Sequence, residues 1–88
     1  MSPITTITIG YRNYINPGFV KEILEPNHAS GKKAKAWALE NSRFIDATAG
    51  RKARCILYMT TGHVILCGIN CRLIRERIIG KIGIGLAV

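Results

Sequence analysis

The stretch that decides this fold reads FIDATAGRKARCILYMTTGHVILC, from Phe44 to Cys67. It contains two uninterrupted apolar runs, at 55–59 and 64–67, which are separated by the turn residues 60–62. Strands without polar residues are typical of a sheet that is covered on both faces. The sequence therefore predicts a hairpin with strands at 52–59 and 63–67, and this hairpin is expected to form the centre of the fold.

A basic turn, residues 50–54, precedes this hairpin. The side chains of Asp46 and Thr48 are of the kind that bond to nearby backbone amides, and Gly50 permits a positive φ, so a structured turn is expected. Arg51 and Lys52 are adjacent, and Arg54 would project to the same side of a strand as Lys52. Such a group of cations can hold successive phosphates of a nucleic acid. The alternative is an ordinary solvated basic turn.

Patterns outside this stretch predict the remaining elements. Strands are expected at 6–9, 11–16, 19–24 and 43–45, although 19–24 is also compatible with a helical turn. One helix is expected at 32–40 with Ser30 as its N-cap, and another at 71–79 between the N-cap Asn70 and the terminating Gly80. These elements make a small α+β fold, with a mixed sheet and two short helices in a single domain, 1–88. Its core would span about 4–79, and 80–88 would form an apolar tail.

The apolar content suggests self-association. The chain has 88 residues, of which 48% are hydrophobic, and its mean hydropathy is +0.15. This exceeds what a small monomer hides easily. The helix at 32–40 places Ala34, Trp37 and Ala38 on one side, so it can cover one face of the hairpin. The other face is expected to meet another subunit, and Trp37 is interpreted as a core or interface residue.

The charge balance points to an anionic partner. Thirteen Lys and Arg residues oppose five Asp and Glu residues, which gives a net charge of +8 and a pI of about 10.0. That balance favours a nucleic acid or an anionic membrane surface. The sequence has no apolar run long enough to span a bilayer and no signal-peptide pattern, so we expect a cytoplasmic protein without a membrane partner. Its three cysteines would stay reduced there.

Catalysis or metal binding would have to use His63 and the cysteines. His63 and Cys67 on one strand would lie about 13 Å apart at roughly 3.3 Å per residue, too far for direct pairing. Cys55, Cys67 and Cys71 contain no CxxC pair, so a zinc site is not indicated. We therefore predict a protein that is not an enzyme, with no catalytic residues, metal, cofactor or small-molecule substrate. The thiols are interpreted as buried and inert.

Several motifs together resemble the RemA family of bacterial DNA-binding regulators. They are ITIG at 7–10, Asn13, the run IDATAGRKAR at 45–54, and HVIL at 63–66. The resemblance covers roughly 4–77. The chain departs from the family pattern at Phe19, where members usually carry a basic residue, and at Ser30, where proline is usual.

The resemblance implies a homo-oligomeric ring that binds duplex DNA around a basic outer surface and regulates transcription of biofilm and extracellular matrix genes. It assigns the essential DNA contacts to Arg51 and Lys52. Together with the residue pattern, it predicts a DNA-binding site made of Arg51, Lys52, Arg54, Lys32, Lys33 and Lys35. Because of the change at Phe19, an RNA-binding protein or a structural oligomer without DNA specificity is the alternative.

Overall fold

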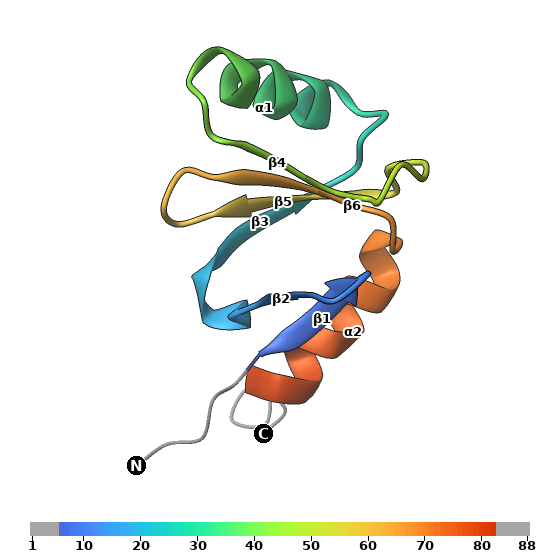
Figure 1. Ribbon diagram of the computed structural model, residues 1–88. Helices are drawn as coiled ribbons and strands as arrows, with labels where there is room; N and C mark the ends of the chain where they lie inside the picture. The colour runs from blue at the N-terminus through green and yellow to red at the C-terminus, as the bar shows by residue number, and fades with distance from the viewer. Residues whose placement is uncertain (1–5, 83–88) are drawn as a thin grey trace.

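The computed structural model describes residues 6–82, which fold into three layers (Figure 1). A four-stranded sheet lies in the middle, with one helix on its first face and a two-stranded sheet and the second helix on its other face. The elements follow the chain in the order β1 (Ile7–Gly10), β2 (Asn13–Ile15), a 3-10 turn (Pro17–Phe19), β3 (Val20–Leu24), α1 (Ala29–Glu40), β4 (Phe44–Ala47), β5 (Cys55–Met59), β6 (Val64–Cys67) and α2 (Cys71–Ile82). The predicted α+β class with two helices is confirmed.

The central hairpin forms the middle of the four-stranded sheet, whose strand order is β3-β5-β6-β4. β5 is antiparallel to β3 and β6, whereas β4 runs parallel to β6. Because β4 ends where β5 begins, the loop between them projects from a single end of the sheet (Figure 1). The fold thus displays the predicted basic turn at that end.

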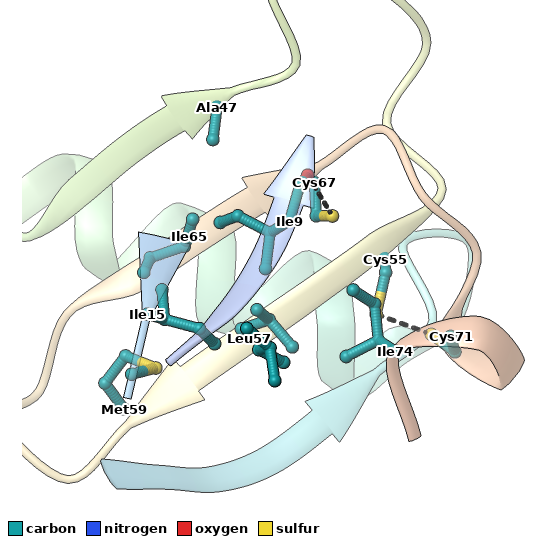
Figure 2. Close-up of a cluster of buried hydrophobic side chains, with 11 residues drawn as sticks. Ile9, Ile15, Ala47, Cys55, Leu57, Met59, Ile65, Cys67, Cys71 and Ile74 are labelled. Carbon is teal, nitrogen blue, oxygen red and sulfur yellow. Dashed lines mark hydrogen bonds between the residues drawn. The ribbon is translucent and has the colours of Figure 1, made fainter. Parts of the chain in front are cut away.

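Successive residues of β5 and β6 alternate between two cores, as side chains on a strand must. Ile56, Val64 and Leu66 pack with Ala38 of α1 on the first face. Leu57 and Ile65 belong to the second, larger core (Figure 2). The prediction that both faces of the hairpin are covered is therefore confirmed.

The second face is covered by the same chain, so the expectation that it meets another subunit is wrong. Ile7, Ile9 and Ile15 from β1 and β2 are buried there together with Ile74 of α2. The reason is the alternation in the first strands, which gives the N-terminal hairpin one apolar side. This hairpin and α2 complete the sandwich over the sheet (Figure 1).

The helix ends differ in part from the prediction. α1 begins at Ala29 after the N-cap residue His28, so Ser30 lies in the first turn and is not the cap. Asn70 does cap α2, because its Oδ1 accepts a hydrogen bond of 2.9 Å from the Leu73 N–H. Gly80 does not end α2: it lacks the left-handed conformation that stops helices, and the helix continues to Ile82. Residues 83–88 of the expected tail lie outside the described part.

Trp37 is not a core residue. Its side chain is 44% exposed on α1, beside the β5–β6 turn, and the position of a Cβ on Gly62 would be 3.8 Å from the indole. It lines a groove of about 340 Å³ with Leu24, Tyr58 and Val64. Because Trp37 is exposed in an apolar groove, its role as an interface residue stays a prediction.

Candidate nucleic-acid interface

The loop between β4 and β5, residues 48–54, is held in one conformation by its own hydrogen bonds. Ala49 and Gly50 have φ values of 54° and 80°, and the Arg51 N–H donates to the Thr48 carbonyl at 3.0 Å. Two successive positive φ values are the pattern of a type I′ turn. The Oδ1 atom of Asp46 accepts hydrogen bonds from the Thr48 N–H at 2.9 Å and the Thr48 hydroxyl at 2.6 Å. The predicted structured turn is confirmed.

We expect these bonds to make the stability of the fold depend on pH. The hydroxyl and N–H of Thr48 bond to the ionised carboxylate, so they lower the pKa of Asp46 below its ordinary value of 3.8. A lowered folded-state pKa adds stability that is present above the unfolded value and is lost as the pH falls through the folded one. We expect Asp46→Asn to be less stable than wild type at pH 7, and the difference to shrink below about pH 4. Urea titrations across this range measure it, and a difference independent of pH would contradict it.

Arg51, Lys52 and Arg54 are all exposed along this loop. The strand predicted to start at 52 starts at Cys55, so strand geometry does not establish that Lys52 and Arg54 project to the same side. Arg54 instead leads into the strand, where its N–H donates to the Cys67 carbonyl at 2.8 Å. The Arg51 guanidinium carbon lies 5.7 Å from the centre of the Tyr11 ring, within the range of a cation–π contact.

Lys52 lies near two of the α1 lysines that were predicted to bind DNA. Lys32, Lys35 and Lys52 line a common groove of about 370 Å³, whose floor includes Ile56 and Leu66. The Lys35 ammonium also lies 6.0 Å from the centre of the Phe44 ring. Lys33, in contrast, lines the groove that contains Trp37, on the other side of α1. The structure therefore brings Lys32 and Lys35 to the basic loop but not Lys33.

The turn between β1 and β2 is a part of this surface that the sequence reasoning missed. Tyr11 and Arg12 are its central residues, and both are exposed with positive φ values of 53° and 64°. A Cβ at Gly68 would lie 3.8 Å from the Tyr11 ring and 3.9 Å from the Lys52 carbonyl, so this turn and the basic loop meet at Gly68. The strand expected at 11–16 begins only at Asn13, so Tyr11 and Arg12 form a two-residue turn of type I′ and do not belong to a strand.

We name this surface the basic end; it consists of Arg12, Lys32, Lys35, Arg51, Lys52 and Arg54. Its cations are not neutralised within the described part of the chain, where the sole salt bridge joins Arg72 and Glu76 on α2 at 3.5 Å. Non-glycine residues with positive φ at Tyr11, Arg12 and Ala49 add backbone strain, which proteins keep most often at functional sites. The arrangement suits a multiply charged anion.

The residues weighed for catalysis do not form a site. His63 lies just before β6, where its Nδ1 is 2.7 Å from the Thr61 hydroxyl. The three cysteines are buried, and burial raises the pKa of Cys67 and Cys71 above the ordinary thiol value. Residues 6–82 contain no group of three or more His, Cys, Asp or Glu side chains placed to hold a metal. None of the helices in that part is long and apolar enough to cross a bilayer.

The fold and the site define a small α+β protein that displays a fixed cluster of cations at one end of its sheet. Comparison with known proteins assigns it further: a model of the RemA-like family, described as extracellular matrix regulatory protein A-like, matches residues 6–78. The chain belongs to the RemA-like family.

Relatives from several bacteria carry the same kind of name. A protein of Leptospira biflexa named "Putative regulatory protein" is 31% identical over 89% of this chain and 83% of its own length. Relatives with names of the same form come from a Geobacillus species, at 32% identity over 89% of this chain and 90% of that protein, and from Desulfatibacillum aliphaticivorans, at 38% over 81% and 80%. The names are those of regulatory proteins and not of enzymes.

Proposed function

We propose that this protein is a cytoplasmic transcriptional regulator that binds duplex DNA through its basic end. The observation that carries the proposal is the meeting of three separate segments at one end of the sheet: the β1–β2 turn, the start of α1 and the 48–54 loop. Lysine and arginine side chains that are not engaged in salt bridges can bond to phosphate oxygens. The family description, extracellular matrix regulatory protein A-like, supports regulation of extracellular matrix genes, and the proposal extends this to genes for biofilm formation.

Arg51 and Lys52 are proposed as the principal contacts. Arg51 can grip a phosphate with two parallel hydrogen bonds, and the ring of Tyr11 holds its side chain at the edge of the loop. Lys52 brings a point charge into the groove, where Lys32 and Lys35 add two more. Arg54 extends the cationic surface toward β5. Lys33 is proposed as a peripheral contact at most, since it faces the other groove.

A homo-oligomer, and specifically a ring, is proposed as the assembled form. Support comes from exposed aromatic residues, namely Tyr14 at 64%, Phe19 at 54% and Trp37 at 44% exposure. Of these, Phe19 and Trp37 lie near the β5–β6 turn, away from the basic end. The groove of Leu24, Trp37, Tyr58 and Val64 offers an apolar surface for a neighbouring copy. Several copies on one duplex would add avidity to a site that makes few contacts per subunit.

A salt titration tests the proposal directly. If Arg51 and Lys52 of each subunit neutralise about two phosphates, they should contribute roughly −1.8 per subunit to the slope of the logarithm of the DNA association constant against the logarithm of salt concentration. Fluorescence anisotropy with a labelled duplex measures this slope. A slope near zero, or no binding at low salt, would remove duplex DNA as the ligand.

Phe19 supports a second candidate, an RNA-binding or structural oligomer. Its ring is 54% exposed at a position where the resemblance leads one to expect a basic side chain. Without a basic side chain at this position, attraction to any nucleic acid is weaker, and the surface there is aromatic. A structured RNA hairpin in the same titration separates the two candidates: tighter binding of RNA than of duplex DNA at every salt concentration favours the second.

Arg12 should contribute to DNA binding without contributing to folding. Arg12→Gly removes the cation and also removes the strain of a φ of 64° at a residue with a Cβ. We expect a loss of DNA affinity of about tenfold, the equivalent of one charge-assisted hydrogen bond, and no loss of thermal stability. Anisotropy and thermal unfolding measure the two properties. Arg12→Lys is the control, because it keeps the charge and should retain most of the affinity.

A further inference from the structure

Two of the three cysteines lie directly against each other in the larger core. Cys55 is the first residue of β5 and Cys71 is the first residue of α2, and their Sγ atoms are 2.9 Å apart (Figure 2). Both side chains are buried, with 0% and 2% exposure. Sixteen positions separate them along the chain, so the fold and not the local sequence creates the pair.

We propose that Cys55 and Cys71 form a dithiol that closes into an intramolecular disulfide when the protein is oxidised by a peroxide. A disulfide needs a sulfur–sulfur distance of about 2.05 Å, so the two atoms must approach by less than about 1 Å. Small rotations of the two side chains supply a movement of that size. This inference does not depend on DNA binding.

Cys67 is held away from this pair, although it is the cross-strand neighbour of Cys55 in the sheet. Its thiol donates to the Ile9 carbonyl at 3.2 Å (Figure 2). Its sulfur also accepts from the Ile69 N–H at 3.4 Å. These bonds direct the Cys67 sulfur toward β1. The geometry therefore selects Cys71 as the partner of Cys55 and leaves one thiol free.

The reaction balances with peroxide as the oxidant. One thiolate attacks a peroxide oxygen, so that an S–O bond forms, the O–O bond breaks and a first water leaves. The second thiol then attacks the sulfenic sulfur, so that the S–S bond forms and the S–O bond breaks with loss of a second water. In total, two thiols give up two hydrogens to one hydrogen peroxide molecule, which becomes two waters. Cys71 is the better first nucleophile, because its exposure of 2% exceeds the 0% of Cys55 and it lies at the start of a helix.

The disulfide would join the end of the basic loop to α2. The Cys71 sulfur also lies 3.4 Å from the Leu24 carbonyl and 3.9 Å from the carbonyl of Arg54, the residue that precedes Cys55. The pair therefore sits where β3 ends and where β5 and α2 begin. Burial raises the pKa of both thiols, so closure should be slow and should accumulate under sustained oxidation.

Oxidation of the full wild-type chain with hydrogen peroxide, without denaturant, tests the proposal. Trypsin cleaves after Arg54 and Arg72, and the peptide 55–72 contains all three cysteines. The oxidised protein is unfolded, its free thiols are blocked with iodoacetamide, and this peptide is fragmented by mass spectrometry. We expect the peptide to lack two hydrogens and to carry the label on Cys67 only. A label on Cys55 or Cys71, three labelled cysteines, or a disulfide between two chains would overturn the proposal.

Two variants provide a matched comparison. Cys67→Ala replaces a buried cysteine with a residue of similar size. Peroxide should still oxidise both remaining thiols of this variant, Cys55 and Cys71. Cys71→Ser should retain its two thiols, Cys55 and Cys67, under the same treatment. If either variant fails to fold, the labelling of the wild-type peptide still decides the question. Oxidised wild type should also unfold at a higher urea concentration than reduced wild type, and a lower concentration would contradict closure within the native fold.

Discussion

Replacing both Arg51 and Lys52 with alanine is expected to reduce the affinity for duplex DNA by about 100-fold or more per subunit. A hydrogen bond to a charged group contributes about 1.5–3 kcal/mol, and the double variant removes two such groups, so about 3–6 kcal/mol is lost. The magnitude of the salt slope should fall by roughly 1.8 per subunit, because two phosphate contacts disappear. Fold stability should be unchanged, since both side chains are exposed on the loop and the turn is held by Asp46 and Thr48.

Lys21→Ala with Arg43→Ala is the matched control for this experiment. These two exposed cations lie near the start of β3 and just before β4. Val20 pairs with Met59 at the end of β5, and β4 runs from Phe44 toward the basic loop, so both residues are at the opposite end of the sheet. The control removes the same net charge but should retain most of the DNA affinity. An equal loss in the two variants would mean that net charge, and not the basic end, determines binding.

Gly31→Ala is expected to destabilise the fold by about 3 kcal/mol, although alanine is the better helix former. Gly31 is buried in the first turn of α1, where an added Cβ would overlap the Glu25 carbonyl oxygen and lie 3.3 Å from the Pro26 Cα. Both obstacles are backbone atoms, so the clash is relieved only if the segment before α1 moves. That segment and α1 line the groove with Lys32 and Lys35, so the variant should also weaken DNA binding. Urea unfolding measures the change in free energy.

Gly80→Ala in α2 provides the comparison. An added Cβ at this exposed position would meet nothing within 4 Å. The same substitution should therefore raise stability by up to about 1 kcal/mol, in line with helix propensity alone. Changes in unfolding free energy of opposite sign for the two variants would confirm that close packing against the chain before α1 makes Gly31 necessary. Equal effects would contradict this account of the packing.

Much of the fold could be predicted because its signals are local. The apolar runs at 55–59 and 64–67 identified strands covered on both faces, and the residues from Asp46 to Gly50 identified the structured turn before them. The segment that covers the second face of the hairpin could not be predicted from the local sequence pattern. It depends on the isoleucines of β1 and β2 packing against strands about fifty residues later, which only the tertiary fold decides.

The candidate site was predictable in part for the same reason. The loop cations were evident from their spacing, but the start of β5 was placed too early, because Lys52 lies in the loop before the strand. The lysines of α1 are separated because neighbouring residues on a helix point about 100° apart, which sends Lys33 to a different groove from Lys32. Arg12 was missed because it was expected in a strand at 11–16, whereas it lies in the turn between β1 and β2, and that turn meets the basic loop only in three dimensions.

Sedimentation of the protein alone and with a duplex of several helical turns tests the central claim most directly, because it reports assembly and ligand together. We expect the protein alone to sediment as a single oligomer with a mass several times its 9.7 kDa subunit mass. The mixture should move as a faster species that contains both protein and DNA. The Arg51→Ala, Lys52→Ala variant should keep the first species and lose the second. A wild-type protein that sediments as a monomer and leaves the duplex at its own mass would contradict the account.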